Sequence, residues 1–276
     1  MTHPTDAATT TTSTAASATA PTTAPTTAPA PAATTAAGRT RGLTLTVAPE
    51  IAERYPDCRT AAVLVLGVKN AEPWPETEEA LSLFESEVRD GTRHLPGQEE
   101  PAIAVWHDLL RSFGTNPRRT RPSVDALSRR LVKSGRVPRI SPLVDTCNLV
   151  SLRYMLPTGG YDLDGITEGF SLRYARPGDV HVPLGKPDER ETPVDGEVVY
   201  ADGGNVLTRH WNHRDADSTK VTERTRNVML LLEGVAPVVP PEVLADAQRE
   251  LAALVAPHAE AVSLYDFDPA TETRVT

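Results

Sequence analysis

The segment 141–164 reads SPLVDTCNLVSLRYMLPTGGYDLD, and it joins the two kinds of structure that this chain is expected to combine. Ser141 and Pro142 are a helix start signal, because proline is well tolerated in the first helical turn. The expected helix runs to about Tyr154, since Pro157 follows soon after. A glycine pair comes next, and it indicates either a tight turn or a close approach of the backbone to a ligand.

The chain before this segment looks helical and the chain after it looks strand-rich. Apolar residues at helical spacing predict three earlier helices, over 73–91, 99–113 and 123–135. The short apolar run 61–68, AAVLVLGV, is typical of a strand that is buried on both faces. After Phe170, short strand-like runs alternate with Gly, Pro and Asp clusters, and an amphipathic helix is expected over 241–255. The prediction is an α+β fold with helices packed on a mixed, largely antiparallel sheet.

The composition divides the chain in two. Residues 1–38 are almost wholly Thr, Ala, Pro and Ser, and such a segment cannot bury enough apolar surface to offset its ordering entropy. We therefore expect a disordered tail there and a single domain over 39–276. No apolar run is long enough to span a bilayer, and two cysteines, Cys58 and Cys147, give no disulfide framework. The sequence predicts a cytoplasmic protein that does not enter a membrane.

Charge is unevenly distributed along the chain. The net charge of −9 argues against indiscriminate nucleic-acid binding. The region 111–139 is an exception, because Asp125 is its only acid among many basic residues. Such a patch predicts docking on phosphates, although a solvated helix face with salt bridges is the alternative. The cations expected to contact phosphates are Arg118, Arg119, Arg121, Arg129, Arg130, Lys133, Arg136 and Arg139.

Four polar residues are candidates for a binding pocket. Asp145 and Asn148 are three residues apart and therefore share one face of the expected helix. An asparagine can hold an amine or a carbonyl by paired hydrogen bonds, but polar residues near helix starts also cap backbone groups. Glu197 and Asp202 belong to the expected strand GEVVYAD. They are either pocket acids or the solubilising charges of an edge strand.

The segment 208–215, TRHWNHRD, is the densest polar and aromatic cluster. If it is a strand, its side chains alternate between two faces, so that one set packs into the core and the other lines a cleft. We expect the cleft set to be His210, Asn212 and Arg214. Trp211 would then either stack on a nucleic-acid base or lie in the core.

The common catalytic and cofactor motifs are missing from this sequence. It has no P-loop, no HExxH, no G-x-S-x-G and no Rossmann fingerprint. The two histidines of TRHWNHRD have no third ligand nearby, so no metal site is predicted. No cofactor and no obligate protein partner are expected.

An ordered series of motifs resembles the B3/B4 domain of bacterial phenylalanyl-tRNA synthetase β subunits, and free-standing proteins built around that domain. The motifs are RRTRPSVDALSRRLVKSGRVPRISPLVDTCNLVSL, PTGGYDLDGI, GEVVYAD and TRHWNHRD, and the resemblance covers about Leu43 to Asp268. In the synthetase this domain hydrolyses wrongly charged tRNA. The resemblance therefore implies trans-editing hydrolysis of mischarged aminoacyl-tRNA. Acyl transfer from aminoacyl-tRNA in specialised metabolism, or non-catalytic binding of tRNA or an amino acid, remain alternatives.

The resemblance also implies roles for single residues. Cys147 and Asn148 stand where the synthetase has a Thr-Asn pair that lines its amino-acid pocket, and Gly159 stands where it has a His. As catalytic residues, Asn148 would hold the aminoacyl group and Glu197 would contact its ammonium or the water. The basic patch would hold tRNA. The other residues expected to bind substrate are Asp145, Cys147, Gly159, Gly160, Asp202, His210, Asn212 and Arg214.

Overall fold

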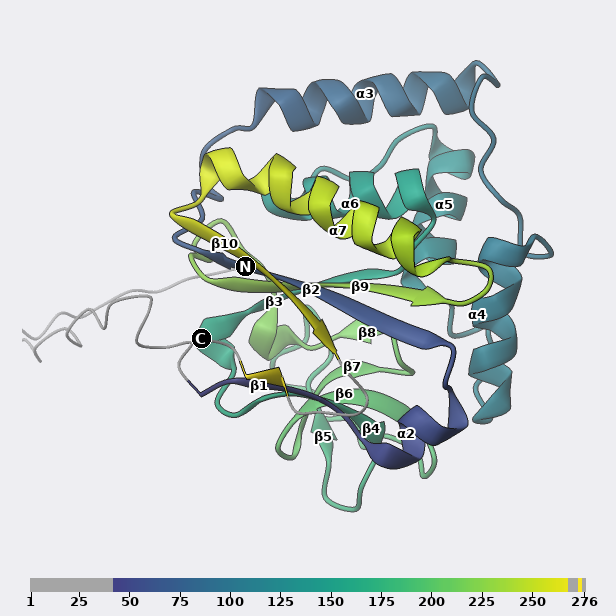
Figure 1. Cartoon of the computed structure of the whole chain (residues 1–276), viewed down its shortest axis with the longest axis vertical. Coiled ribbons are helices and arrows are strands. Elements are labelled where there is room, and N and C mark those ends of the chain that lie inside the picture. Colours follow the sequence, from purple (N-terminus) through teal and green to yellow (C-terminus); the bar gives the residue numbers. More distant parts are fainter. Residues whose placement is uncertain (1–41, 268–272, 275–276) are drawn as a thin grey trace, which may run out of the picture. The chain divides into compact units, whose positions relative to one another are not determined.

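The structure is a computed structural model that describes residues 42–267 and 273–274. All of these residues fall within one compact unit. A four-stranded sheet lies at its centre, with helices against one face and a second, larger sheet against the other (Figure 1). The tail expected over 1–38 lies outside the described residues, so its disorder and the domain start at residue 39 stay predictions.

Most helices begin where the sequence places a proline. The helices are α2 (Pro49–Arg54), α3 (Pro75–Arg89), α4 (Pro101–Ser112), α5 (Ser123–Ser134), α6 (Pro142–Tyr154) and α7 (Pro241–Val255). Proline occupies the first turn in all of them except α5, because its missing N–H and fixed φ cost nothing there. The predicted helices are confirmed to within a few residues, and α2 is an addition that the pattern did not predict. No helix in the described ranges is long and apolar enough to cross a membrane.

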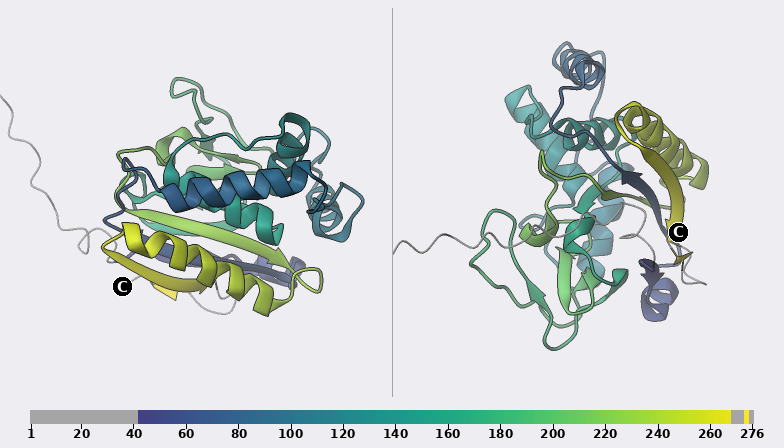
Figure 2. Two further views of the ribbon diagram at one scale, coloured as in Figure 1. Left: turned by 90° about the horizontal axis from the view of Figure 1, so that it is seen from above. Right: turned by 90° about the vertical axis from the view of Figure 1, so that its left-hand side faces the viewer.

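The strands divide between two sheets, as two views from other sides also show (Figure 2). The first sheet has the order β10-β2-β9-β3 and is antiparallel throughout. The second has the order β11-β1-β4-β6-β7-β5, with β8 paired to β7, and its pairs β1–β4 and β5–β7 are parallel. The strands are β1 (Thr44–Val47), β2 (Cys58–Leu66), β3 (Thr158–Asp162), β4 (Gly169–Tyr174), β5 (Val180–His181), β6 (Val198–Asp202), β7 (Asn205–Arg209), β8 (Arg214–Asp215), β9 (Val228–Val235), β10 (Ala261–Phe267) and β11 (Thr273–Arg274). The α+β class with mixed, largely antiparallel pairing is confirmed.

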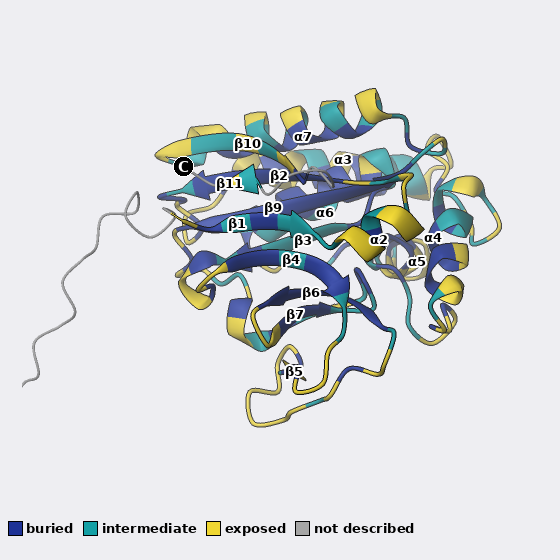
Figure 3. Cartoon of the chain, turned by 60° about the horizontal axis from the view of Figure 1, so that its bottom comes forward, coloured by how far each residue is buried: buried dark blue, intermediate teal, exposed yellow. Residues whose placement is uncertain are grey.

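Strands β2 and β9 are buried on both faces, and Figure 3 shows both in the colour of buried residues. Alternate side chains enter different cores: Leu64 and Leu231 face the second sheet, while Val63 and Leu230 face the helices. Glu233 follows Leu231 by two positions, so the strand period directs it into the layer between the sheets. A carboxyl group is thereby buried between the two sheets.

The segment after β7 does not continue as a strand. β7 ends at Arg209, and His210 and Trp211 adopt left-handed backbone conformations with φ of 49° and 69°. The predicted alternation of faces through this segment is therefore wrong, because two left-handed residues reverse the chain direction. Trp211 is only 1% exposed and packs edge-on against Trp106, so it belongs to the core.

Candidate functional site

A small cavity of about 30 Å³ lies in the layer between the two sheets. Its walls come from β3, β6, β7, β8 and β9, from the loop after β7, and from Ser123 at the start of α5. One water needs roughly 10–15 Å³ of such space, so this cavity holds about two groups of that size. Its lining includes two carboxylates, Glu233 and Asp215, which makes it the strongest candidate for a binding site.

Glu233 is held entirely by neutral donors. Its Oε1 accepts hydrogen bonds from Tyr200 Oη at 2.5 Å and from Trp211 Nε1 at 2.9 Å, and its Oε2 accepts one from Asn212 Nδ2 at 2.8 Å. Burial raises the pKa of Glu233 to about 7, and Asp215 adds to the rise, although the three hydrogen bonds oppose it. The carboxyl group of Glu233 therefore holds its proton to a higher pH than an exposed glutamate does.

Asp215 is the second acid of the cavity. Its Oδ1 accepts a hydrogen bond from Thr208 Oγ1 at 2.7 Å, and that hydroxyl also lies 2.6 Å from Tyr161 Oη. Part of Asp215 stays accessible to solvent, but protein atoms surround its carboxyl group and this desolvation raises its pKa to about 6. Two carboxyl groups with raised pKa values thus share one cavity, an arrangement that is common at functional sites.

Two polar atoms of the cavity lining lack a hydrogen-bond partner within the described residues. Asn212 Oδ1 is one, although its residue is only 8% exposed, and Ser123 Oγ is the other. Because Asn212 donates through Nδ2 to Glu233, its Oδ1 can only accept. Buried polar atoms are rarely left unpaired, so this atom indicates a missing donor such as a water or an N–H group.

Gly159 provides the space into which Tyr161 turns its hydroxyl group. A Cβ atom at position 159 would lie 2.9 Å from Tyr161 Oη, so any side chain there would displace the tyrosine. Gly160 is next on the strand and meets Leu230 and Val221 instead. Of the glycine pair, Gly159 therefore lines the cavity while Gly160 packs toward the helices.

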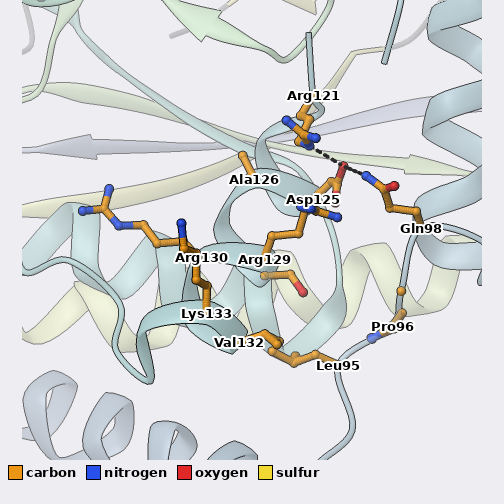
Figure 4. A pocket seen from close by; sticks show the side chains of 12 residues that line it. Leu95, Pro96, Gln98, Arg121, Asp125, Ala126, Arg129, Arg130, Val132 and Lys133 are labelled. Atoms are coloured by element: carbon orange, nitrogen blue, oxygen red, sulfur yellow. Dashed lines mark hydrogen bonds and ion pairs between the residues drawn. The ribbon is translucent and has the colours of Figure 1, made fainter. Parts of the chain in front are cut away.

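A basic groove of about 750 Å³ runs along α5, and Figure 4 shows it from close by. Its cations are Arg121, Arg129, Arg130 and Lys133, and the single carboxylate is Asp125. Asp125 is buried and accepts hydrogen bonds from Gln98 at 3.3 Å and His107 at 3.0 Å, which leaves little of it for solvent. We call this feature the α5 groove. Helix α5 connects it to the cavity, because Ser123 at its first position lines the cavity.

The other predicted cations have different surroundings. Arg139 binds Glu78 Oε2 at 2.7 Å and Glu85 Oε1 at 2.5 Å. This residue therefore forms the salt bridges that were the alternative to phosphate binding. Arg118 and Arg119 are exposed in the loop before α5, and Arg136 is exposed after it.

Glu197 supports the loop that follows β7. It is fully buried, its Oε2 lies 2.7 Å from Arg209 Nη2, and its Oε1 accepts the backbone N–H of His210 at 3.0 Å. Burial alone would raise the pKa of Glu197, but the Arg209 hydrogen bonds and the nearby His210 bring that pKa below its ordinary value. These contacts hold the loop after β7 in place, and Glu197 does not line the cavity.

Two further predicted acids also bind backbone. Asp202 accepts the N–H groups of residues 167, 168 and 169, and Asp145 accepts the N–H of Ile140 at 2.9 Å. Cys147 is buried in the helix-side core, where burial raises the pKa of its thiol to about 12. Neither of these acids lines the cavity.

Of the predicted site residues, only Gly159 and Asn212 line the cavity. Asn148 is half-buried on α6, His210 pairs with Thr115 Oγ1 at 2.9 Å, and Arg214 is exposed on β8. The catalytic role of Asn148 stays a prediction.

Sequence reasoning missed the two carboxylates of the cavity. A signal for one of them was present, because Glu233 interrupts the apolar run VMLLLEG, where a strand buried on both faces rarely carries a charge. Asp215 is the last residue of the singled-out segment TRHWNHRD, but nothing in the sequence distinguished it from the other polar residues there.

Comparison with known proteins matches this architecture to a family. Residues 105–256 match the B3/4 domain family. The chain belongs to the B3/4 domain family. It is 31% identical over 191 residues to the phenylalanine–tRNA ligase β subunit of Nocardia farcinica, covering 69% of this chain and 19% of that protein. It is 37% identical over 99 residues to the same subunit of Mycobacterium leprae, covering 34% of this chain and 12% of that protein.

Among solved structures, the B3/4 chain is similar to an N-terminal fragment of the phenylalanyl-tRNA synthetase β subunit from Pyrococcus horikoshii. The TM-score is 0.36 and the identity is 17%, over 86% of this chain and 59% of that one. The B3/4 chain thus spans less than a fifth of the length of the ligase subunits from Nocardia and Mycobacterium.

Proposed function

We propose that this B3/4 chain hydrolyses the ester bond of mischarged aminoacyl-tRNA in trans, in the cytoplasm. Its relatives are subunits of a ligase that charges tRNA, as their names state. The observation that carries the proposal is the cavity at Glu233, where the buried acceptor Asn212 Oδ1 has no hydrogen-bond partner among the described residues and two carboxyl groups lie beside it.

An aminoacyl group brings a donor for the unpaired oxygen of Asn212. Its α-ammonium carries three N–H groups, which match the unpaired Asn212 Oδ1 and the carboxylates of Glu233 and Asp215. A cation beside Glu233 would favour its ionised form and lower its pKa from about 7. The cavity thus gains both a hydrogen-bond partner and a counter-ion when an ammonium group enters.

The volume of the cavity limits which part of the substrate enters it. About 30 Å³ accommodates an ammonium group and one water, but not an aromatic side chain. The ammonium end of the aminoacyl group is therefore the part that the cavity would hold. An aminoacyl ester is already activated, so a site that positions a water beside its carbonyl carbon can catalyse hydrolysis without a strong nucleophile.

The α5 groove is the proposed docking surface for the tRNA backbone. Its cations Arg129, Arg130 and Lys133 are exposed, and none of them forms an ion pair with an acid in the described part of the chain. Free cations on an acidic protein attract phosphates locally, because the rest of the surface repels them. Helix α5 runs from this groove to the cavity, so a backbone bound along it would approach the site from a fixed direction.

A panel of charged tRNAs tests the proposal. Correctly charged and mischarged tRNAs are incubated with the protein while ester loss and released amino acid are followed, with and without an added amine acceptor. Release of free amino acid from at least one mischarged tRNA is the expected result. Formation of an amide only when the acceptor is present would select acyl transfer instead, and tRNA binding without ester loss would select a binding module.

A further inference from the structure

His213 is held in one tautomer beside the cavity. Its Nδ1 lies 2.7 Å from the backbone carbonyl oxygen of Arg121, and a carbonyl oxygen only accepts hydrogen bonds. Nδ1 must therefore carry the hydrogen, which leaves the lone pair of Nε2 free in the neutral ring. The ring lines the same cavity as Glu233 and Asp215.

The surroundings of this ring favour its neutral form. Burial lowers the pKa of His213, and the charges of Arg214 and Arg209 lower it further, while the Arg121 carbonyl and Glu197 act in the opposite direction. The ring of His210 lies 6.1 Å away between centroids. A neutral imidazole with a free Nε2 is the form that accepts a proton.

The geometry points to His213 as the general base that activates the hydrolytic water, an inference that rests on the hydrolysis proposed above. The other polar groups of the cavity suit this role less well. Glu233 is occupied by three donors and faces the expected ammonium, and Asp215 is bound to Thr208. Ser123 Oγ makes no hydrogen bond to His213 or to any other described residue, so it is not activated as a nucleophile.

The proposed step balances without any further reactant. His213 Nε2 takes a proton from water while the water oxygen bonds to the ester carbonyl carbon. The tetrahedral intermediate then breaks its bond to the ribose oxygen of the terminal nucleotide, and the imidazolium returns the proton to that oxygen. The products are the free amino acid and tRNA with its terminal hydroxyl restored.

The His213→Asn variant separates this chemistry from a structural role. The asparagine amide overlays Nδ1 and can still donate to the Arg121 carbonyl, but it cannot act as a base. We expect kcat for deacylation to fall about 100- to 10,000-fold, the usual contribution of general-base catalysis, while KM changes by less than about threefold. The matched control is His258→Asn, a histidine that lies outside both the cavity and the α5 groove and should keep the parent rate.

A second variant covers the case in which the amide does not preserve the fold. His213→Ala leaves room for added imidazole, which should restore part of the lost rate in proportion to its free-base concentration. Retention of the parent kcat in His213→Asn would overturn the inference, as would a folded His213→Ala that is inactive and not rescued. A purely structural histidine would instead lower tRNA binding and the melting temperature together.

The same assay distinguishes the two levels of failure. If the parent protein deacylates no charged tRNA, the proposed hydrolysis fails and the role of His213 fails with it. If the parent is active and Glu233→Gln is impaired while His213→Asn is not, the site stands and only the general base is wrong.

Discussion

Two buried glutamates of this chain have opposite surroundings. Glu197 is bound to the guanidinium of Arg209, and the pKa of its carboxyl group lies below the ordinary value. Glu233 is bound to a phenol, an indole and an amide, and its pKa is raised to about 7. Both residues are buried in the same fold, so the difference arises from the presence or absence of a cation.

This difference separates charges that hold the fold from charges that are available to a ligand. A buried carboxylate with its own guanidinium is already neutralised, whereas one held by neutral donors still lacks a counter-ion. The same division applies to the cations. Arg139 is bound to two acids, but Arg129 and Arg130 in the α5 groove form no ion pair within the described residues.

The largest effect on stability is expected where a paired charge loses its partner. Arg209→Met would leave Glu197 fully buried without a cation, and breaking a buried pair in this way costs about 3–5 kcal/mol of unfolding free energy. Urea unfolding at pH 7 measures this change. Arg214→Met is the matched control, because Arg214 is exposed, and it should shift stability by less than about 0.5 kcal/mol. Equal losses of stability in the two variants would show that the buried ion pair of Arg209 is no more important to the fold than an exposed arginine.

The pH dependence of stability should have opposite signs for the two glutamates. Glu233 has a folded pKa of about 7 against an ordinary value of 4.5, so between these pH values the folded state binds more protons and the parent loses stability as pH rises. Glu233→Gln removes that loss and should gain about 1–3 kcal/mol relative to the parent between pH 4.5 and 8. In this variant the side-chain amide of Asn212 can rotate, so that its Oδ1 accepts a hydrogen bond from the amide group that replaces the carboxylate.

Glu197→Gln is the counterpart in the same experiment. The pKa of Glu197 is lowered in the folded state, so its contribution to stability is present above the ordinary pKa and is lost as pH falls. This variant should therefore lose stability relative to the parent as pH rises. Shifts of the same sign in both variants would contradict the comparison.

A smaller effect, on binding alone, is expected in the α5 groove. Replacing Arg129, Arg130 and Lys133 by Ala should weaken the salt dependence of tRNA binding. The slope of log K against log salt concentration should become smaller by about 2–3, roughly one for each lost phosphate contact. Binding between 50 and 200 mM salt measures it. Arg139→Ala is the control and should leave the slope unchanged, because Arg139 already binds Glu78 and Glu85. An unchanged slope in the triple variant would place the tRNA elsewhere.

The smallest effect is expected from the N-terminal segment. Deletion of residues 1–38 should change the melting temperature by less than about 2 °C, because Thr, Ala, Pro and Ser offer little apolar surface to bury. Thermal unfolding of the two proteins gives the comparison. A drop of many degrees would show that the segment packs against the domain.

The fold was largely predictable from the sequence because its signals are local. Proline marks the starts of α6 and α7, and the apolar run around Val63 and Val65 is the central strand β2. The reversal after Arg209 was not predictable, because His210 and Trp211 adopt left-handed conformations that side chains rarely favour.

The site was predictable only in part, because it is assembled from distant segments. Gly159 and Asn212 were singled out by the sequence and line the cavity. Glu233 could not be assigned to the site from the sequence, because it meets its partner Tyr200 only in the folded chain. Tyr200 belongs to the other sheet and is 33 positions away along the chain. Glu197 shows the converse, since a carboxylate in a motif looks available until its guanidinium partner is located.

Deacylation by Glu233→Gln tests the central claim most directly. The variant keeps the shape of the carboxyl group but cannot carry the charge that would hold an ammonium. With a mischarged tRNA that the parent hydrolyses, we predict a rate about 100- to 1,000-fold lower, the equivalent of about 2.7–4 kcal/mol of lost transition-state stabilisation. Glu260→Gln, an exposed control, should keep the parent rate. A folded Glu233→Gln protein with the full parent rate would contradict the account.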